Sequence, residues 1–203
     1  MYLRVAAEEK VAGIEVSGSP VDKACGMEYI DMLKKAGVKL FHKVGSVRHA
    51  VHAEKVGYDG IYAAGIEEGG HPLNDDVTTM VLTSRIAEEV KLPIVTVGGV
   101  ANGKTLAAAL MLGAEGVMMA SRFMATKECN VHDNIKNELV RRQEHETTLI
   151  CKSIHLQARA LRNKNVDAIL KVEQDGGGFE KILPLITGVR IAEAWQTGDT
   201  DLA

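Results

Sequence analysis

The chain has 203 residues, of which 46% are apolar and 25% charged, with 20 glycines and only 4 prolines. This composition is ordinary for a soluble globular domain with a sizeable core, and it excludes collagen-like, disordered and disulfide-scaffold proteins. The net charge is −3, from 24 basic and 27 acidic side chains without a basic run. We therefore expect no binding of nucleic acid or of an anionic membrane, and a small molecule as partner.

The N-terminal sequence and the cysteines indicate in which cellular compartment the protein is expected. Residues 1–10 do not form a basic-then-apolar export signal, and no stretch approaches the roughly 18 apolar residues of a membrane span. Three cysteines, Cys25, Cys129 and Cys151, form no CxxC pair and are odd in number, which suits reduced thiols. We expect a cytoplasmic protein, with self-association into a homo-oligomer left open.

Up to about residue 130 the sequence repeats one unit: a short apolar run, a turn, an amphipathic helix and a glycine that ends the helix. A helical pattern at residues 3–9 precedes the first apolar run. The near-continuous apolar runs predict strands covered on both faces, at residues 11–16, 38–44, 60–64, 93–97 and 116–120. The segments between them predict helices at about residues 22–36, 47–56, 77–91 and 103–112. This alternation favours parallel βαβ units, in an open doubly wound sheet or a (β/α)8 barrel.

Beyond residue 130 the apolar runs cease and helical patterns take over. The predicted helices are at residues 131–144, 153–163, 166–174 and 189–197. Five strands are too few to close a barrel of eight. The barrel interpretation thus predicts a partial barrel in residues 1–130 and a helical extension in residues 131–203.

The loop after the third predicted strand is the first candidate site, because active sites of parallel α/β folds lie beyond the carboxyl ends of the strands. Gly69 and Gly70 would let the backbone approach a ligand, and His71 follows them directly. An imidazole can accept a proton near neutral pH, so His71 is the best candidate for a general base. The alternative is a histidine of a glycine-rich turn without a catalytic role.

Two further loops predict an anion site. Gly98 and Gly99 lead from the fourth strand into a helix whose first N–H groups and dipole favour a negative charge. The loop after the fifth strand offers backbone N–H groups and a hydroxyl, from Met118, Met119, Ala120 and Ser121. Successive loops after the last two strands of a barrel commonly hold a phosphate, whereas either loop alone could be plain turn geometry.

Lys43 is the last candidate residue, and several common catalytic and binding motifs are absent. Lys43 ends the second predicted strand, where an ammonium could contact an electron-rich ring; an exposed or ion-paired lysine is the alternative. The sequence contains no P-loop, HExxH, GxSxG or complete GxGxxG motif. We expect no metal site.

Four segments resemble nitronate monooxygenases, formerly called 2-nitropropane dioxygenases, in content, order and spacing. They are F-H-K-V-G-S-V-R-H-A at residues 41–50, G-x-E-x-G-G-H at 65–71, P-I-V-T-V-G-G-V at 93–100 and G-V-M-M-A-S-R-F-M-A-T at 116–126. The similarity covers nearly the whole chain. Related members of the family include NAD(P)H:quinone reductases and an FMN-dependent enoyl-[acyl-carrier-protein] reductase.

The resemblance implies a TIM barrel of the FMN-dependent type, with strands four to eight in this chain and the first three missing. It implies that His71 is the catalytic base and that Gly69 lines the flavin. It also implies that Gly98 and Gly99, with the loop from Met118 to Ser121, grip the FMN phosphate. The flavin would accept electrons from an alkyl nitronate and then react with dioxygen, while His71 would deprotonate a neutral nitroalkane.

Two other functions remain open at this point. One is an NAD(P)H-dependent flavin oxidoreductase acting on a quinone or an enoyl thioester, because the loops named above would bind flavin and not the second substrate. The other is a non-catalytic, incomplete piece that pairs with a missing half or with itself, since an open array of five strands exposes two edges.

Overall fold

The computed structural model describes residues 1–202, and their internal contacts form two compact units. The first unit comprises Met1–Glu67 and Asp75–Met118. The second comprises Glu68–Asn74 and the chain from Met119 onward. Each unit is described by itself below. The domain division at residue 130 stays a prediction.

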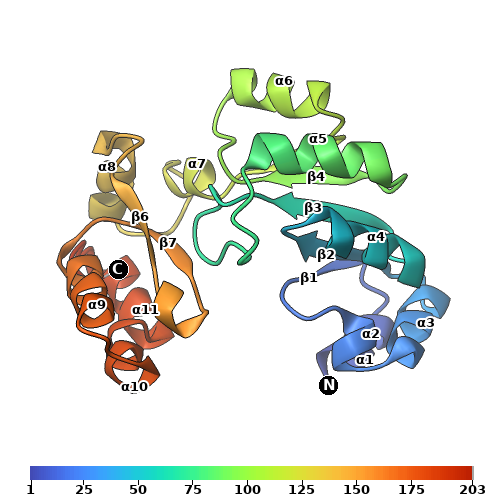
Figure 1. The fold of residues 1–203 in the computed structure, drawn as a ribbon, viewed down its shortest axis with the longest axis horizontal. Coiled ribbons are helices and arrows are strands. Elements are labelled where there is room, and N and C mark those ends of the chain that lie inside the picture. The colour runs from blue at the N-terminus through green and yellow to red at the C-terminus, as the bar shows by residue number, and fades with distance from the viewer. Residues whose placement is uncertain (203) are drawn as a thin grey trace. The chain divides into compact units, whose positions relative to one another are not determined.

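The first unit is built on a five-stranded parallel sheet in the order β1-β2-β3-β4-β5 (Figure 1). The strands are β1 (Gly13–Val16), β2 (Lys39–Val44), β3 (Gly60–Ala64), β4 (Ile94–Val97) and β5 (Gly116–Met118). All five predicted strands are confirmed, with ends that differ by at most two residues. Every strand pairs with its neighbour in the sequence, whereas the strand order of a doubly wound sheet reverses at a switch point. The sheet therefore has the topology of part of a (β/α)8 barrel.

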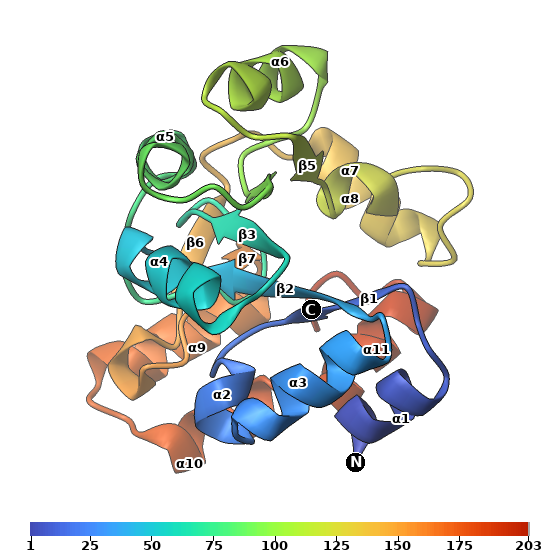
Figure 2. The same cartoon turned by 90° about the vertical axis from the view of Figure 1, so that its right-hand side faces the viewer.

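Helices alternate with these strands, and in Figure 2 they follow one another along one side of the sheet. They are α1 (Tyr2–Glu8), α2 (Val21–Ala24), α3 (Met27–Lys35), α4 (Val47–Val56), α5 (Thr79–Glu89) and α6 (Gly103–Met111). The predicted glycine stop is confirmed at Gly57, whose φ of 93° ends α4 in the left-handed conformation. The single helix predicted over residues 22–36 is wrong. Gly26 has a φ of 109°, which no helix contains, so the chain breaks there into α2 and α3.

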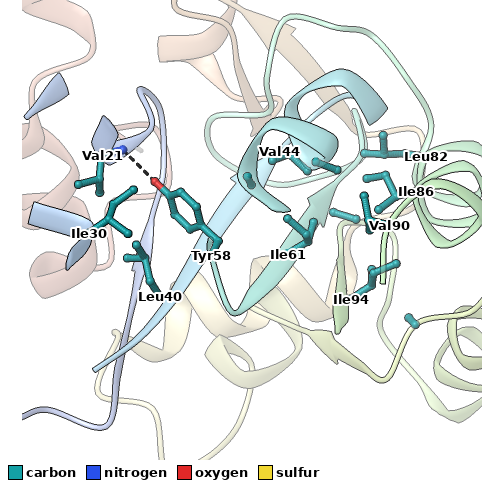
Figure 3. Packing of buried hydrophobic residues seen from close by; sticks show 14 of the residues in the cluster. Val21, Ile30, Leu40, Val44, Tyr58, Ile61, Leu82, Ile86, Val90 and Ile94 are labelled. Carbon is teal, nitrogen blue, oxygen red and sulfur yellow. Dashed lines mark hydrogen bonds between the residues drawn. The ribbon is translucent and has the colours of Figure 1, made fainter. Parts of the chain in front are cut away.

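The core of the first unit lies between the sheet and its helices (Figure 3). Alternate residues of β2 point into it, and Leu40 and Val44 are completely buried. The hydroxyl oxygen of Tyr58 accepts a hydrogen bond of 2.8 Å from the amide of Val21, so even its polar end is paired inside the core (Figure 3). The other face of the sheet is partly exposed and carries Phe41 against Tyr62, with ring centroids 5.7 Å apart.

The second unit contains an antiparallel pair of strands among helices. The strands are β6 (Thr147–Ile150) and β7 (Ala158–Leu161). The α-helices are α7 (Ser121–Met124), α8 (Asp133–Arg141), α9 (Lys164–Gln174), α10 (Phe179–Ile182) and α11 (Gly188–Thr197), with 3₁₀ turns η1 (Lys152–Ile154) and η2 (Leu183–Leu185). The strands and α9 enclose a small core of Ile150, Cys151, Val166, Ile169 and Ile182.

The helix predicted at residues 153–163 is wrong, because this segment contains η1 and β7. Cys151 and His155 flank η1 with φ of 61° and 56°, a left-handed conformation that non-glycine residues rarely adopt. These two residues turn the chain back so that β7 pairs with β6. Within residues 1–202, no helix has the length and apolar character needed to cross a bilayer.

Candidate active site

The strand register brings several candidate residues to one edge of the sheet. Val44 pairs with Ala63, and Ala64 pairs with Val97, so β2, β3 and β4 end at the same level. Val97 in turn pairs with Met118 at the end of β5. The predicted residues Lys43, Gly98 and Met118 consequently lie along the carboxyl edge, where parallel α/β folds bind ligands.

The turn after β4 is open toward a ligand. Gly98 and Gly99 have φ of 95° and 70°, so both positions favour glycine for its backbone freedom. Gly99 is exposed, and a Cβ there would meet only Glu67, at an ordinary 3.6 Å. Among residues 1–202, no hydrogen bond uses the amides of Gly98, Gly99 or Val100. Amides that remain unpaired at a turn can bind an anion.

The N-terminus of α6 is different, and here the expectation of free helix amides is wrong. Asn102 Oδ1 accepts from the amides of Lys104 at 3.0 Å and Thr105 at 3.1 Å. Thr105 Oγ1 accepts in return from the amides of Ala101 and Asn102, at 3.0 and 3.1 Å. This capping box satisfies four amides within the chain. These four amides are not available to an anion, whereas the amides of Gly98 and Gly99 in the preceding turn are unpaired among the described residues.

The loop after β3 is fixed at its base in the first unit. Glu67 Oε2 accepts from the amide and the hydroxyl of Thr79, at 2.8 and 2.9 Å, at the start of α5. A Cβ on Gly65 would lie 2.3 Å from the amide nitrogen of Thr79, so a larger residue there would displace the helix start. The amide of Ile66 also donates to the carbonyl of Val77 at 2.8 Å.

The tip of the same loop is fixed within the second unit, on both sides of His71. The amide of Gly70 donates to the carbonyl of Arg159 at 3.0 Å, and the amide of Arg159 donates back to Gly70. Gln157 Nε2 donates to the carbonyl of Leu73 at 2.6 Å. The backbone that carries the exposed His71 side chain is therefore pinned on either side by residues next to or in β7.

Arg159 and Gln157 were not found from the sequence. The backbone of Arg159 pairs with Gly70, and the side-chain amide of Gln157 donates to the carbonyl of Leu73, so both bonds join residues more than 80 positions apart. No motif marks such contacts. Gly65 and Glu67 lie inside the predicted loop, but only the close approach of Thr79 reveals what they do.

The remaining candidates follow β5. Ala120 and Ser121 are exposed and Met119 is partly buried. The carbonyl of Ala120 accepts from the amides of Phe123 and Met124, both at 3.0 Å, which begins α7 at Ser121. The first unit thus holds Lys43, Gly98, Gly99 and Met118, and the second holds Gly69, Gly70, His71, Met119, Ala120 and Ser121.

A phosphate-bearing flavin fits the residues that are present, as judged at the Gly98–Gly99 turn. Two consecutive left-handed glycines leave unpaired amides, and the position of Gly99 is exposed to a ligand. A phosphoryl group can accept hydrogen bonds from such amides without displacing a side chain.

Comparisons with known proteins agree with this geometry. The family model described as "Nitronate monooxygenase" matches residues 10–196. A "Probable nitronate monooxygenase" of Staphylococcus aureus (strain JH9) is 30% identical over 181 residues, which is 85% of this chain and 51% of the relative. A protein of Rhodococcus jostii (strain RHA1), named "(3aS,4S,5R,7aS)-5-hydroxy-7a-methyl-1-oxo-octahydro-1H-indene-4-carboxyl-CoA dehydrogenase", is 36% identical over 149 residues, or 73% of this chain and 41% of the relative.

Solved structures are similar over almost the whole chain. FabK from Thermotoga maritima matches with a TM-score of 0.88 and 31% identity, covering 99% of this chain and 61% of FabK. Nitroalkane oxidase from Streptomyces ansochromogenes matches with a TM-score of 0.77 and 24% identity, over 98% of this chain and 58% of the oxidase, and supports the fold alone. The chain spans about half the length of the curated relatives it matches.

Proposed function

Because the chain belongs to the nitronate monooxygenase family, whose members are flavin-dependent, we propose that it acts as an FMN-dependent nitronate monooxygenase. The reaction is the oxidation of alkyl nitronates with dioxygen. The observation that carries the proposal is the left-handed Gly98–Gly99 turn with its unpaired amides, at the carboxyl edge of a parallel sheet.

Several residues would hold the cofactor. The amides of Gly98 and Gly99, with the loop from Met118 to Ser121, would bind the FMN phosphate. Gly69, Gly70 and Lys43 would line the flavin. When bound, FMN would supply the two-electron chemistry and the reaction with dioxygen.

His71 would act on the substrate. One of its imidazole nitrogens takes the proton from the carbon that bears the nitro group of a neutral nitroalkane, and the electron pair of that C–H bond stays on the substrate as the nitronate. The hydrogen bonds of Gly70 and Leu73 support this role, because they restrict the backbone on both sides of His71.

The test compares His71→Ala with the matched control His145→Ala, whose side chain is 75% exposed. Turnover of a neutral nitroalkane should fall about 10²- to 10⁴-fold in His71→Ala, the usual contribution of a general base. Turnover of the preformed nitronate and flavin content should change little, because neither requires proton abstraction. The control variant should behave like the wild type.

Two results would contradict this proposal. An equal loss of activity on nitroalkane and nitronate, together with loss of flavin, would make His71 a structural residue. Colourless, associated wild-type protein that gains no flavin on reconstitution would instead favour the non-catalytic piece.

A second candidate function is an NAD(P)H-dependent flavin oxidoreductase that acts on a quinone or an enoyl thioester. It is favoured by the relative from Rhodococcus jostii, which is 36% identical and named as a carboxyl-CoA dehydrogenase. Anaerobic bleaching of the flavin separates the two functions. Bleaching by a nitronate but not by NADPH or NADH supports the monooxygenase, and the reverse supports the reductase.

We also propose that the protein is cytoplasmic. Its three cysteines are free thiols, and Cys151 is buried. Free thiols persist in a reducing compartment.

A further inference from the structure

The glycine turn after β4 is held by few contacts within the protein. Among residues 1–202, no hydrogen bond uses the amides of Gly98, Gly99 or Val100, and glycine has more backbone freedom than any other residue. A cavity of about 150 Å³ is lined by both glycines together with residues of α5, β4 and α6. Because the turn borders this empty space, its position depends on the side chains that approach it.

Glu67 is the side chain that approaches the turn. It is exposed and lines the same cavity as the two glycines. A Cβ at Gly99 would lie 3.6 Å from Cβ and 3.8 Å from Cγ of Glu67, and among residues 1–202 it would meet no other neighbour within 4 Å, the adjacent residues of the chain aside. The aliphatic part of Glu67 is therefore the nearest support of Gly99 on that side.

The carboxylate of Glu67 is fixed by two hydrogen bonds. Its Oε2 accepts from the amide of Thr79 at 2.8 Å and from the hydroxyl of Thr79 at 2.9 Å. The same hydroxyl lies 3.4 Å from the carbonyl oxygen of Val97, the last residue of β4, which accepts from the amide of Gly65 at 3.1 Å. Since Thr79 begins α5, Glu67 connects the loop after β3 and the start of α5 with the turn after β4.

The charge of Glu67 does not explain its position beside a turn that would bind an anion. A carboxylate repels a phosphate that lies close to it. The hydrogen bonds to Thr79 restrict the rotation of the side chain, so Glu67 can instead act by packing against the turn.

We propose that Glu67 is a positioning residue for the FMN phosphate. Its carboxylate, held by Thr79, keeps its methylene groups against Gly99, and this contact keeps the amides of Gly98 and Gly99 in the orientation that binds the phosphate. The inference rests on the proposed function, in which this turn holds FMN.

The test compares the affinities for FMN and for riboflavin, which has the same ring system without the phosphate. Fluorescence titration of each flavin with the full 203-residue chain measures both dissociation constants, and their ratio gives the contribution of the phosphate. The wild type should bind FMN about 10- to 100-fold more tightly than riboflavin, which is the effect of hydrogen bonds to a charged group.

The variants change the support of the turn in different ways. Glu67→Ala removes the methylene contact and both hydrogen bonds, so the preference for FMN should fall about tenfold, whereas the affinity for riboflavin should change little. Glu67→Gln keeps the methylene groups and an oxygen that can accept from Thr79, so it should keep the preference. Thr79→Val removes only the hydroxyl donor and should lower the preference by less than Glu67→Ala.

Glu115→Ala is the matched control, because it removes an exposed carboxylate just before β5, at the opposite edge of the sheet. This variant should behave like the wild type. In the flavin-free chain, inorganic phosphate should shift the NMR signals of the Gly98 and Gly99 amides, and the shifts should be smaller in Glu67→Ala. If Glu67→Ala does not fold, Thr79→Val and Glu67→Gln decide.

Three results would overturn the role of Glu67. They are an equal loss of affinity for both flavins in Glu67→Ala, a preference for FMN that is unchanged or increased in that variant, and a loss in Glu67→Gln as large as in Glu67→Ala. Wild-type protein that does not prefer FMN to riboflavin would refute the phosphate-binding turn of the proposed function, and the role of Glu67 with it. The two failures are therefore distinguishable.

Discussion

His42 lies inside the core of the first unit and is 3% exposed. Its Nδ1 makes a hydrogen bond of 2.8 Å with the carbonyl of Val16, and its ring lies 5.1 Å from that of Tyr58. Burial lowers the pKa of this imidazole, which outweighs the opposite effect of the hydrogen bond to Val16. In the folded protein His42 is therefore neutral at a pH where a solvated histidine begins to protonate.

This shift predicts a pH dependence of stability. The unfolded chain takes up a proton at His42 near pH 6.5, before the folded chain does, so the free energy of unfolding falls as pH drops from about 6.5 toward the lower pKa of the folded state. His42→Gln should be less stable overall but should lose this part of the pH dependence. Urea denaturation between pH 7.5 and 5.5 measures both, with His145→Gln as the control. An unchanged pH dependence in His42→Gln would refute the assignment.

The catalytic candidate shows what residue types alone can and cannot predict. A histidine after two glycines at the end of a strand is enough to single out His71. The sequence does not predict that Arg159 and Gln157 fix its backbone, because those contacts form only when a distant hairpin reaches the loop.

The backbone amides at the start of α6 and in the turn before it differ in whether they are hydrogen-bonded within the protein. Asn102 and Thr105 satisfy four amides of the helix start, whereas the amides of Gly98 and Gly99 stay unpaired. The capping box thus stabilises the helix, and we propose that the amides of the preceding turn bind the FMN phosphate.

Substitutions should separate these two roles. Asn102→Ala should lower the free energy of unfolding by about 1 kcal/mol and leave the affinity for FMN nearly unchanged. Gly99→Ala should weaken FMN binding at least as much as it lowers stability, because its φ of 70° strains an alanine and shifts the turn. Flavin fluorescence titration and urea denaturation measure the two effects. A larger loss of FMN affinity in Asn102→Ala than in Gly99→Ala would contradict this division.

Strands marked by a continuous apolar run were predicted well, and strands without one were not. The five parallel strands are short apolar runs with a glycine at or next to at least one end, and the sequence predicts each of them closely, although only β2, β3 and β4 contain buried residues. Strands β6 (T-T-L-I) and β7 (A-R-A-L) contain threonine or arginine, so neither is the continuous apolar run that marked the parallel strands. Their turn depends on left-handed Cys151 and His155, for which the sequence has no glycine signal.

At the scale of the whole molecule, each unit has its own hydrophobic core. Leu40 and Ile61 belong to the core of the first unit, and Ile169 and Ile182 to that of the second. The partition depends on which residues pack together in three dimensions. Composition shifts along the sequence do not mark it, and the short segment Glu68–Asn74 belongs with a later part of the chain.

Truncating one core residue in each unit should test this partition. Ile61→Ala and Ile169→Ala each remove a fully buried side chain and should cost about 2 to 5 kcal/mol. Amide hydrogen exchange should show the greater loss of protection in the unit that contains the substitution. Each variant is the control for the other. A greater loss in the opposite unit would show that the cores are assigned wrongly.

The polypeptide passes between the two units three times, after Glu67, Asn74 and Met118. No single backbone cleavage can therefore release one unit intact from the other. A single cut between residues 118 and 119 would leave the segment 68–74 on the N-terminal fragment, although this segment packs with residues of the C-terminal fragment. If the two fragments were produced from separate genes, they would have to associate before Gly70 could pair with Arg159 beside His71.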